Sequence, residues 1–240
     1  MCVPNKIEKG INHVFWCMDS LRYDMFTEAD VPHFHGFTDY RRVYSRAAIT
    51  PPSIFGVYMN LSWYESRGAT PVPWMTRWVW LPKNFAKEGY HSTFITSNPM
   101  MELYRDIFSR DINNYDMLKG CIYHGDTIVN KIIKIFDTVY KPKFIFALLM
   151  ETHQPYPYKK NITQAEINVK YRPVELQKRS LEKLDEDFKR LTEKLSGTNT
   201  DILVFSDHGE LDLKLEGNQG HGPGLFHPKL FEIPLGRAVV

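Results

Sequence analysis

Three apolar stretches of the sequence run directly into residues that can bind a metal ion or transfer a proton. Asp19 follows the first stretch, Glu151-Thr152-His153 follows the second, and Ser206-Asp207-His208-Gly209-Glu210 follows the third. One such residue after one stretch is ordinary, whereas three stretches with this property point to a shared site. Asp19, Asp207 and His208 offer the oxygen and nitrogen donors that hold Zn²⁺ or Mn²⁺ in proteins. We therefore predict that they form a divalent metal site.

The segment from Ala47 to Phe55 supplies a nucleophile for such a site. Pro52 suits the first turn of a helix, which places Thr50 close to the helix N-terminus. A metal ion and the helix dipole together would lower the pKa of the Thr50 hydroxyl and attract an anionic ester. These residues alone leave open the alternative that Thr50 and Ser53 only cap the helix.

The other candidate residues also have purely structural interpretations. Asp19 can cap a helix over residues 21–26. His153, His221 and His227 can each be loop residues that face solvent. The joint occurrence of these residue types behind several predicted strands favours a common site over separate structural roles.

Four apolar stretches are typical of buried strands: His13–Met18, Ser92–Thr96, Phe144–Met150 and Asp201–Phe205. Helical patterns lie between them, and strands that alternate with helices indicate crossover connections. The sequence therefore predicts an α/β fold with a mostly parallel central sheet and helices on both faces. In such sheets ligands bind beyond the carboxyl ends of the strands, which is where the candidate residues lie.

Three helices are predicted from their patterns. The clearest begins near Pro173, ends at Gly197 and carries one apolar stripe on an otherwise charged surface. The stripe consists of Leu181, Leu184, Phe188, Leu191 and Leu195. A second helix opens at Asp126, and a shorter one covers residues 82–89.

Length and composition favour one globular unit. The chain has 240 residues, of which 43% are hydrophobic and 24% charged, so it can bury a substantial core. No internal repeat or Gly/Ser-rich linker divides it, and residues 1–240 are predicted to form a single catalytic domain. The segment from Val31 to Trp80 lacks clean periodicity and is expected to be irregular. A final strand is expected within residues 231–235.

The charge and the cysteine content indicate which classes of binding partner and which cellular compartment are expected. The net charge is +2 without a block of five like charges, which argues against nucleic acid and membrane surfaces as partners. Cys2, Cys17 and Cys121 are odd in number and lack the spacing of a disulfide framework or a cysteine zinc site. The N-terminus has no apolar signal core. The sequence therefore predicts a cytoplasmic protein and leaves its oligomeric state open.

The order of these motifs resembles the alkaline phosphatase superfamily, in particular its sulfatase and phosphoethanolamine or phosphoglycerol transferase branch. Residues 19–24 look like the first metal motif, and Thr50-Pro51-Pro52-Ser53 lies where the transferases have a threonine. Residues 152–156 are similar to the substrate-side motif, and residues 206–210 match the most specific signature of the family. His221 and the following glycine resemble its closing His-Gly element.

The resemblance implies a role for each candidate residue. The principal metal would be held by Asp19, Thr50, Asp207 and His208. Zn or Mn is the expected metal, with Ca or Mg as alternatives, and Thr50 would be the nucleophile that takes up the phosphoryl group. His153 and His221 would bind substrate or a second metal.

We therefore expect a metal-dependent phosphoester hydrolase or phospho-group transferase that acts through Thr50 on a small-molecule ester. Ile54 stands where the sulfatase motif has an arginine, and threonine is not converted to formylglycine, so arylsulfatase activity is not expected. Two alternatives remain open. One is a sulfate-ester hydrolase that uses the unmodified threonine, and the other is a family member that binds a phosphorylated ligand without turnover.

Overall fold

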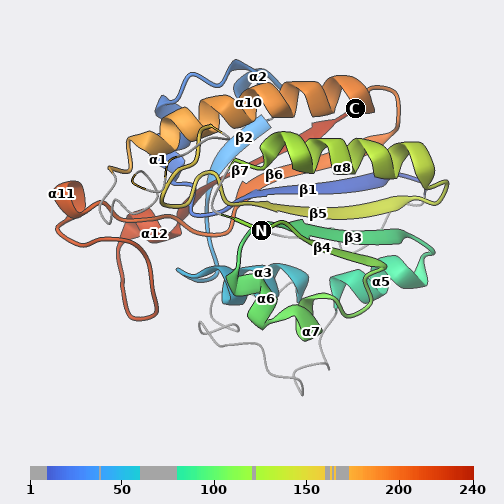
Figure 1. The fold of residues 1–240 in the computed structure, drawn as a ribbon, viewed down its shortest axis with the longest axis horizontal. Coiled ribbons are helices and arrows are strands. Elements are labelled where there is room, and N and C mark those ends of the chain that lie inside the picture. The colour runs from blue at the N-terminus through green and yellow to red at the C-terminus, as the bar shows by residue number, and fades with distance from the viewer. Residues whose placement is uncertain are drawn as a thin grey trace.

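The computed structural model describes residues 10–37, 39–59, 80–120, 123–159, 163, 165 and 173–240. Within these residues a central sheet of seven strands lies between two layers of helices (Figure 1). The predicted α/β fold with helices on both faces of the sheet is therefore confirmed. None of the described helices is both long and apolar enough to cross a membrane.

The middle of the sheet is parallel. The strands are β1 (Asn12–Met18), β2 (Asp39–Tyr44), β3 (His91–Thr96), β4 (Asn114–Met117), β5 (Lys143–Leu149), β6 (Thr200–Ser206) and β7 (Glu232–Val239). In space they follow the order β2-β7-β6-β1-β5-β3-β4. The pairs from β6 to β4 are parallel, whereas β7 is antiparallel to both β6 and β2. The carboxyl ends of β6, β1, β5 and β3 therefore lie side by side.

The helices form two layers, one on each face of the sheet (Figure 1). One layer consists of α1 (Tyr23–Glu28), α2 (Pro32–Phe37), α8 (Gly125–Thr138) and α10 (Leu176–Leu195). The other consists of α3 (Thr50–Tyr58), α5 (Leu81–Lys87), α6 (Met100–Leu103) and α7 (Arg105–Phe108). Two short helices, α11 (Leu213–Glu216) and α12 (Pro228–Phe231), lie between β6 and β7 in the chain.

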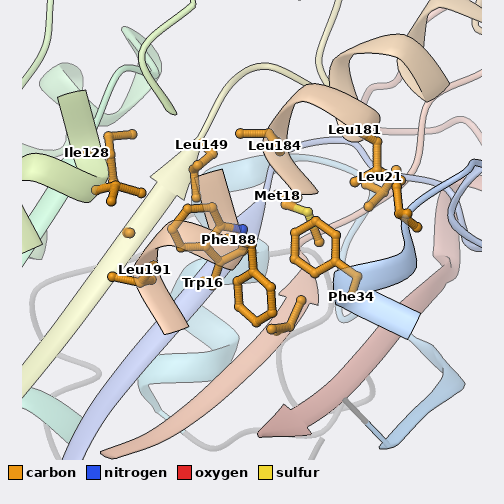
Figure 2. Packing of buried hydrophobic residues seen from close by; sticks show 14 of the residues in the cluster. Trp16, Met18, Leu21, Phe34, Ile128, Leu149, Leu181, Leu184, Phe188 and Leu191 are labelled. Carbon is orange, nitrogen blue, oxygen red and sulfur yellow. The ribbon is translucent and has the colours of Figure 1, made fainter. Parts of the chain in front are cut away.

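The central strands divide their side chains between two cores because neighbouring residues of a strand point to opposite faces. Trp16 of β1 enters the core beneath α10, whereas Phe15 enters the core beneath α3 and α5. In the first core Phe188 of α10 stacks on Phe34 of α2, with the ring centroids 4.4 Å apart, and its edge meets Trp16 (Figure 2). These contacts attach α10 and α2 to the middle of the sheet.

Most of the predicted elements are confirmed. The four predicted strands are β1, β3, β5 and β6, and the expected final strand is β7. The three predicted helices are α10, α8 and α5, and every residue of the predicted apolar stripe of α10 is buried.

The prediction of irregular structure from Val31 to Trp80 is wrong for most of the part that the structure describes. This part contains α2, β2 and α3, while residues 60–79 lie outside the described residues. Strand β2 at the sheet edge is largely exposed and therefore has no apolar run. Helix α3 is buried at every residue, so its sequence lacks the contrast between an apolar and a polar face on which the prediction relied.

A buried carboxylate joins the carboxyl end of β5 to the start of α8. Glu151 is fully buried, and its carboxylate accepts a hydrogen bond of 2.7 Å from the backbone N–H of His124, which precedes α8. A carboxylate at this position compensates the free N–H groups of the helix N-terminus. Burial nevertheless raises the pKa of Glu151 to about 7, because the hydrogen bonds offset only part of the lost hydration.

The packing around Phe188 predicts a large effect of its removal. We expect Phe188→Ala to lower the free energy of unfolding by about 3–5 kcal/mol, because a cavity forms between α10, α2 and β1. Urea denaturation measures this change. The control is Glu182→Ala on the exposed side of the same helix, which is expected to stay within about 0.5 kcal/mol of the parent. Equal losses in the two variants would contradict the packing argument.

The burial of Glu151 predicts a pH dependence of stability. Its pKa in the folded state exceeds the ordinary value of 4.5, so between pH 4.5 and about 7 the folded state binds more protons than the unfolded state. Rising pH therefore removes stability in this window. Between pH 5 and pH 8 we expect the free energy of unfolding of Glu151→Gln, which cannot titrate, to fall by about 2.5 kcal/mol less than that of the parent. Urea denaturation at both pH values tests this, and parallel losses would refute it.

Candidate active site

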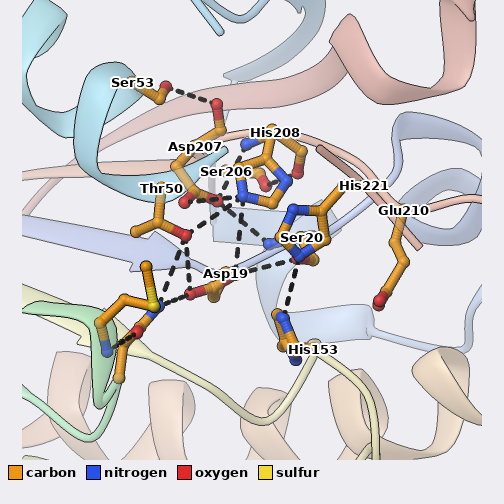
Figure 3. Close-up of polar contacts among 12 residues, drawn as sticks. Asp19, Ser20, Thr50, Ser53, His153, Ser206, Asp207, His208, Glu210 and His221 are labelled. Carbon is orange, nitrogen blue, oxygen red and sulfur yellow. Dashed lines mark hydrogen bonds and ion pairs between the residues drawn. The ribbon is translucent and has the colours of Figure 1, made fainter. Parts of the chain in front are cut away.

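The predicted site residues meet at the carboxyl end of the parallel strands (Figure 3). The register pairs Met18 of β1 with Ser206 of β6 and with Leu149 of β5, so these three strands end at the same level. The next residues along the chain are therefore neighbours in space. Asp19 leaves β1 beside Asp207, which leaves β6.

Asp19, Asp207 and His208 form a compact donor cluster. One ligand atom of each lies within 4.8 Å of those of the other two, and all three side chains are buried. The Thr50 hydroxyl joins the cluster by donating to Asp19 Oδ2 at 3.3 Å, and it lies 3.2 Å from His208 Nε2. The structure thus brings together the four residues that the sequence predicts as metal ligands.

The donor atoms of this cluster fit a divalent metal ion. His208 Nδ1 donates to the carbonyl oxygen of Gly209 at 2.9 Å, which leaves the lone pair of Nε2 directed into the cluster. Asp207 Oδ1 accepts hydrogen bonds from the backbone N–H groups of Ser20 and His208, at 3.0 and 2.9 Å. Asp207 Oδ2 is buried without a hydrogen-bond partner. A buried carboxylate oxygen without a partner is costly, and a cation would satisfy it.

The two carboxylates raise the electrostatic cost of the cluster. Burial, and then repulsion from Asp19, raise the pKa of Asp207 to about 6. Asn98 offsets part of this negative charge, because its Nδ2 donates to Asp19 Oδ2 at 2.5 Å. A second donor to Asp19 is the hydroxyl of Ser20, at 2.9 Å from Oδ1.

Thr50 is the first residue of α3, as predicted from the position of Pro52. Pro51 and Pro52 carry no N–H, so the first turn offers fewer free backbone donors than an ordinary helix. The dipole of α3 still favours negative charge at this position. Ser53 Oγ donates to the carbonyl oxygen of Asp207 at 2.6 Å and thereby fixes the start of α3 against the end of β6.

Two backbone features hold the turns that carry these ligands. Ser20 adopts a left-handed conformation with φ of 62°, which is strained for a residue other than glycine and lets the chain turn sharply after Asp19. Gly209 lies so close to the chain before β7 that a Cβ atom would lie 1.8 Å from the carbonyl oxygen of Lys229. The glycine in the segment 206–210 is therefore required by close approach of two backbones.

His153 and His221 lie together beside the metal-ligand cluster (Figure 3). Their Nε2 atoms are 3.0 Å apart, and the centroid of the His221 ring is 4.3 Å from that of His208. Together with Glu210 they form a second group that could hold a metal ion. Glu210 Oε2 is fixed by the backbone N–H of Gln154 and the hydroxyl of Tyr156.

The two histidines have opposite electrostatic environments. Burial disfavours the charged form of His153, but the carboxylates of Glu210 and Asp19 outweigh it and raise its pKa. Burial together with His208 and His153 lowers the pKa of His221 to about 2. His153 Nδ1 donates to the carbonyl oxygen of Gln154 at 2.6 Å. A proton on the pair is therefore favoured on His153 over His221, and His221 stays neutral.

Three residues around the site fall outside the sequence prediction. His227, considered there as a loop residue, caps α12 by accepting the backbone N–H of Lys229 at 3.3 Å. Asn98 and Glu210 contact the candidate residues but are not predicted as site residues. A signal for Asn98 was present, because it follows the strand predicted at residues 92–96 just as Asp19 follows the first strand.

One family model and several solved structures match the chain. The model of the sulfatase family matches residues 21–235 of the chain. No curated protein matches the chain. The C-terminal periplasmic domain of EptC from Escherichia coli, in complex with Zn, has a TM-score of 0.71 at 16% identity, covering 97% of this chain and 73% of that one.

Two further solved structures share the fold. The C-terminal periplasmic domain of the phosphoethanolamine transferase EptC from Campylobacter jejuni has a TM-score of 0.71 at 13% identity, covering 97% of this chain and 80% of that one. A protein in the alkaline phosphatase superfamily from Vibrio parahaemolyticus has a TM-score of 0.68 at 17% identity, and the match covers 97% of this chain and 60% of that one.

The prediction of a cytoplasmic location is contradicted by these comparisons. Both EptC structures, which share the fold of this chain, are periplasmic domains. The cysteine pattern does not decide the compartment, because a chain of this size is stabilised by its cores and needs no disulfide.

The family match extends over most of the chain, and the fold agrees with that of the structural neighbours. The resemblance drawn from the sequence motifs is thereby confirmed. The chain belongs to the sulfatase family and has the fold of the alkaline phosphatase superfamily, whose members are hydrolases and transferases of phosphate and sulfate esters.

Proposed function

We propose that the protein is a metal-dependent phosphoester hydrolase or phospho-group transferase with Thr50 as its nucleophile, and that residues 1–240 act as one catalytic domain. The observation that carries the proposal is the position of the Thr50 hydroxyl, within hydrogen-bond distance of both Asp19 and His208 in a buried donor cluster. A threonine that only caps a helix has no need of these partners.

The metal would be held by Asp19, Thr50, Asp207 and His208. Their oxygen and nitrogen atoms suit Zn or Mn, and the similar EptC domain from Escherichia coli is known in complex with Zn. When bound, a divalent ion supplies a Lewis acid that polarises a phosphoryl oxygen and lowers the pKa of the nucleophilic hydroxyl.

In the first half of the proposed reaction Thr50 displaces the leaving alcohol. A bond from Thr50 Oγ1 to phosphorus forms while the bond from phosphorus to the ester oxygen breaks. Asp19 Oδ2, which already accepts the hydroxyl hydrogen bond, is placed to take the proton of Thr50. Asn98 Nδ2 lies 3.4 Å from Thr50 Oγ1 and orients this oxygen.

The histidine pair acts on the other side of the phosphorus. The raised pKa of His153 favours its protonated form, which is placed to donate a proton to the departing oxygen. His221, whose lowered pKa keeps it neutral, hydrogen bonds to a non-bridging oxygen. In the second half, the oxygen of water or of an acceptor alcohol bonds to phosphorus and gives its proton to His153. The bond from phosphorus to Thr50 Oγ1 breaks, and Asp19 returns its proton to Oγ1.

One feature favours a small phosphate ester over a sulfate ester. Ile54, at the position of the arginine in the sulfatase motif, is fully buried in the core beneath α3 and offers no charge to a sulfate group.

The donor geometry predicts a specific effect of Asp207→Asn on metal binding. An amide can keep the hydrogen bonds that Oδ1 accepts from Ser20 and His208, but it replaces the free Oδ2 with a nitrogen that cannot bind a cation. We expect bound Zn in elemental analysis to fall at least about tenfold, with the fold retained in circular dichroism. Asp116→Asn, which alters a carboxylate paired with Lys131 on the sheet edge, is the control and keeps its metal.

Unchanged metal content in Asp207→Asn would remove this residue from the proposed ligand set. If the variant instead loses its fold while Asp116→Asn does not, the role of Asp207 is structural.

The proposed covalent step predicts the behaviour of Thr50 variants. We expect Thr50→Ala to lower the turnover of a generic phosphoester by about 10³-fold or more, whereas Thr50→Ser retains part of it, because a serine hydroxyl can attack the same phosphorus. Acid quenching during turnover should leave a phosphate on Thr50, which peptide mass analysis detects. Thr192→Ala, a buried threonine of α10 remote from the site, is the matched control.

Parent-like turnover in Thr50→Ala would exclude Thr50 as nucleophile. Parallel assays with sulfate esters distinguish the sulfatase alternative, and metal-loaded protein without turnover on either ester class would favour a binding role.

A further inference from the structure

Gln177 is a fully buried polar residue at the start of α10. It lies one turn before Leu181 and so occupies a place in the apolar stripe of the helix, which the sequence pattern assigns to core packing. A glutamine at such a position is costly unless its amide is fully hydrogen bonded. The partners of this amide therefore explain why the residue is tolerated there.

All the hydrogen bonds of the Gln177 amide go to the backbone of two turns. Nε2 donates to the carbonyl oxygen of Ser20 at 2.9 Å and to that of Thr152 at 2.6 Å. Oε1 accepts the backbone N–H of Arg22 at 3.2 Å. One side chain thus joins the turn after β1 to the turn after β5.

Each of these turns carries one residue of the candidate active site. The first turn begins at Asp19 and passes through the left-handed Ser20, whose carbonyl oxygen is the one that Gln177 binds. The second turn leads from Thr152 to His153. A further contact links them, because Thr152 Oγ1 donates to the carbonyl oxygen of Asp19 at 2.6 Å.

We propose that Gln177 is a positioning residue that fixes the distance between the Asp19 turn, which carries one metal ligand, and the His153 turn, which faces the substrate. The roles of those two turns rest on the proposed function. The amide stabilises the strained Ser20 conformation and holds the His153 backbone at the same time. Without it, both turns relax independently, and Asp19, which accepts the hydrogen bond of the Thr50 hydroxyl, loses its alignment with the proton donor His153.

The test compares Gln177→Met with Leu191→Ala. Methionine keeps the length and volume of glutamine but makes none of the three hydrogen bonds, whereas Leu191→Ala weakens the same core about four turns further along the helix. If Gln177 had a merely structural role, both substitutions would lower the stability of the protein and neither would alter the site. Full-length parent and variant proteins are used throughout.

Three readouts are measured. Competition with a chromophoric chelator gives the affinity for Zn²⁺ alone, and it is expected to fall by about 10- to 100-fold in Gln177→Met. Imidazole NMR signals of His153 and His208 in the metal-free protein are expected to shift. In the phosphoester assay kcat falls with KM nearly unchanged, because alignment in the transition state is lost rather than substrate binding. Leu191→Ala is expected to match the parent in all three.

Gln177→Glu is the conservative variant, and it tests whether part of the hydrogen bonding restores part of the lost function. It has the same shape and keeps the acceptor for Arg22, and in its neutral form it donates to one of the two carbonyl oxygens. We expect its values to lie between those of the parent and of Gln177→Met, and they decide the question if Gln177→Met does not fold.

The outcomes separate this proposal from the proposed function. Equal Zn²⁺ affinity and unshifted imidazole signals in the Gln177 variants would overturn the positioning role. If the parent itself binds no Zn²⁺ and has no turnover, the proposed function fails, while the imidazole signals of the metal-free proteins still decide the role of Gln177.

Discussion

Two buried carboxylates, those of Asp19 and Asp207, lie next to each other at the end of the central sheet, and the surrounding structure is organised around this unfavourable pair. Removing such charges from water is costly, and each raises the cost of the other. The parallel pairing of β1 with β6 forces the contact, because Met18 and Ser206 are in register. Asn98, Ser20 and backbone N–H groups compensate most of the oxygen atoms, and the one left without a partner marks the place for a cation.

The site is held from both faces of the sheet. From one face α3 delivers Thr50, and Ser53 fixes the start of that helix to the backbone of Asp207. From the other face α10 delivers Gln177, and the same helix is anchored by Phe188 against Phe34. The two cores therefore do more than stabilise the fold, because each one sets the position of a side chain that contacts the site or its turns.

The parts of this arrangement that could be predicted from the sequence are those that a short stretch of residues specifies by itself. Apolar runs located the central strands, and the residues behind them located Asp19, Asp207 and His208. The left-handed turn at Ser20 and the cross-chain bonds of Gln177 have no such signal, since they depend on which strands become neighbours in space. Asn98 lies between these cases. It follows a predicted strand, but an asparagine without an adjacent acid or histidine did not suggest chemistry.

The burial of Thr50 constrains the order of events in the proposed reaction. The sheet and α3 enclose Thr50, Asp19 and His208, whereas His153 and His221 are partly exposed. The leaving alcohol and the second nucleophile must therefore use the same side of the phosphothreonine. Because a single approach serves both, the alcohol has to depart before water or an acceptor can enter, which corresponds to a ping-pong sequence. Hydrolysis and transfer then differ only in which hydroxyl-bearing molecule next occupies the space beside His153.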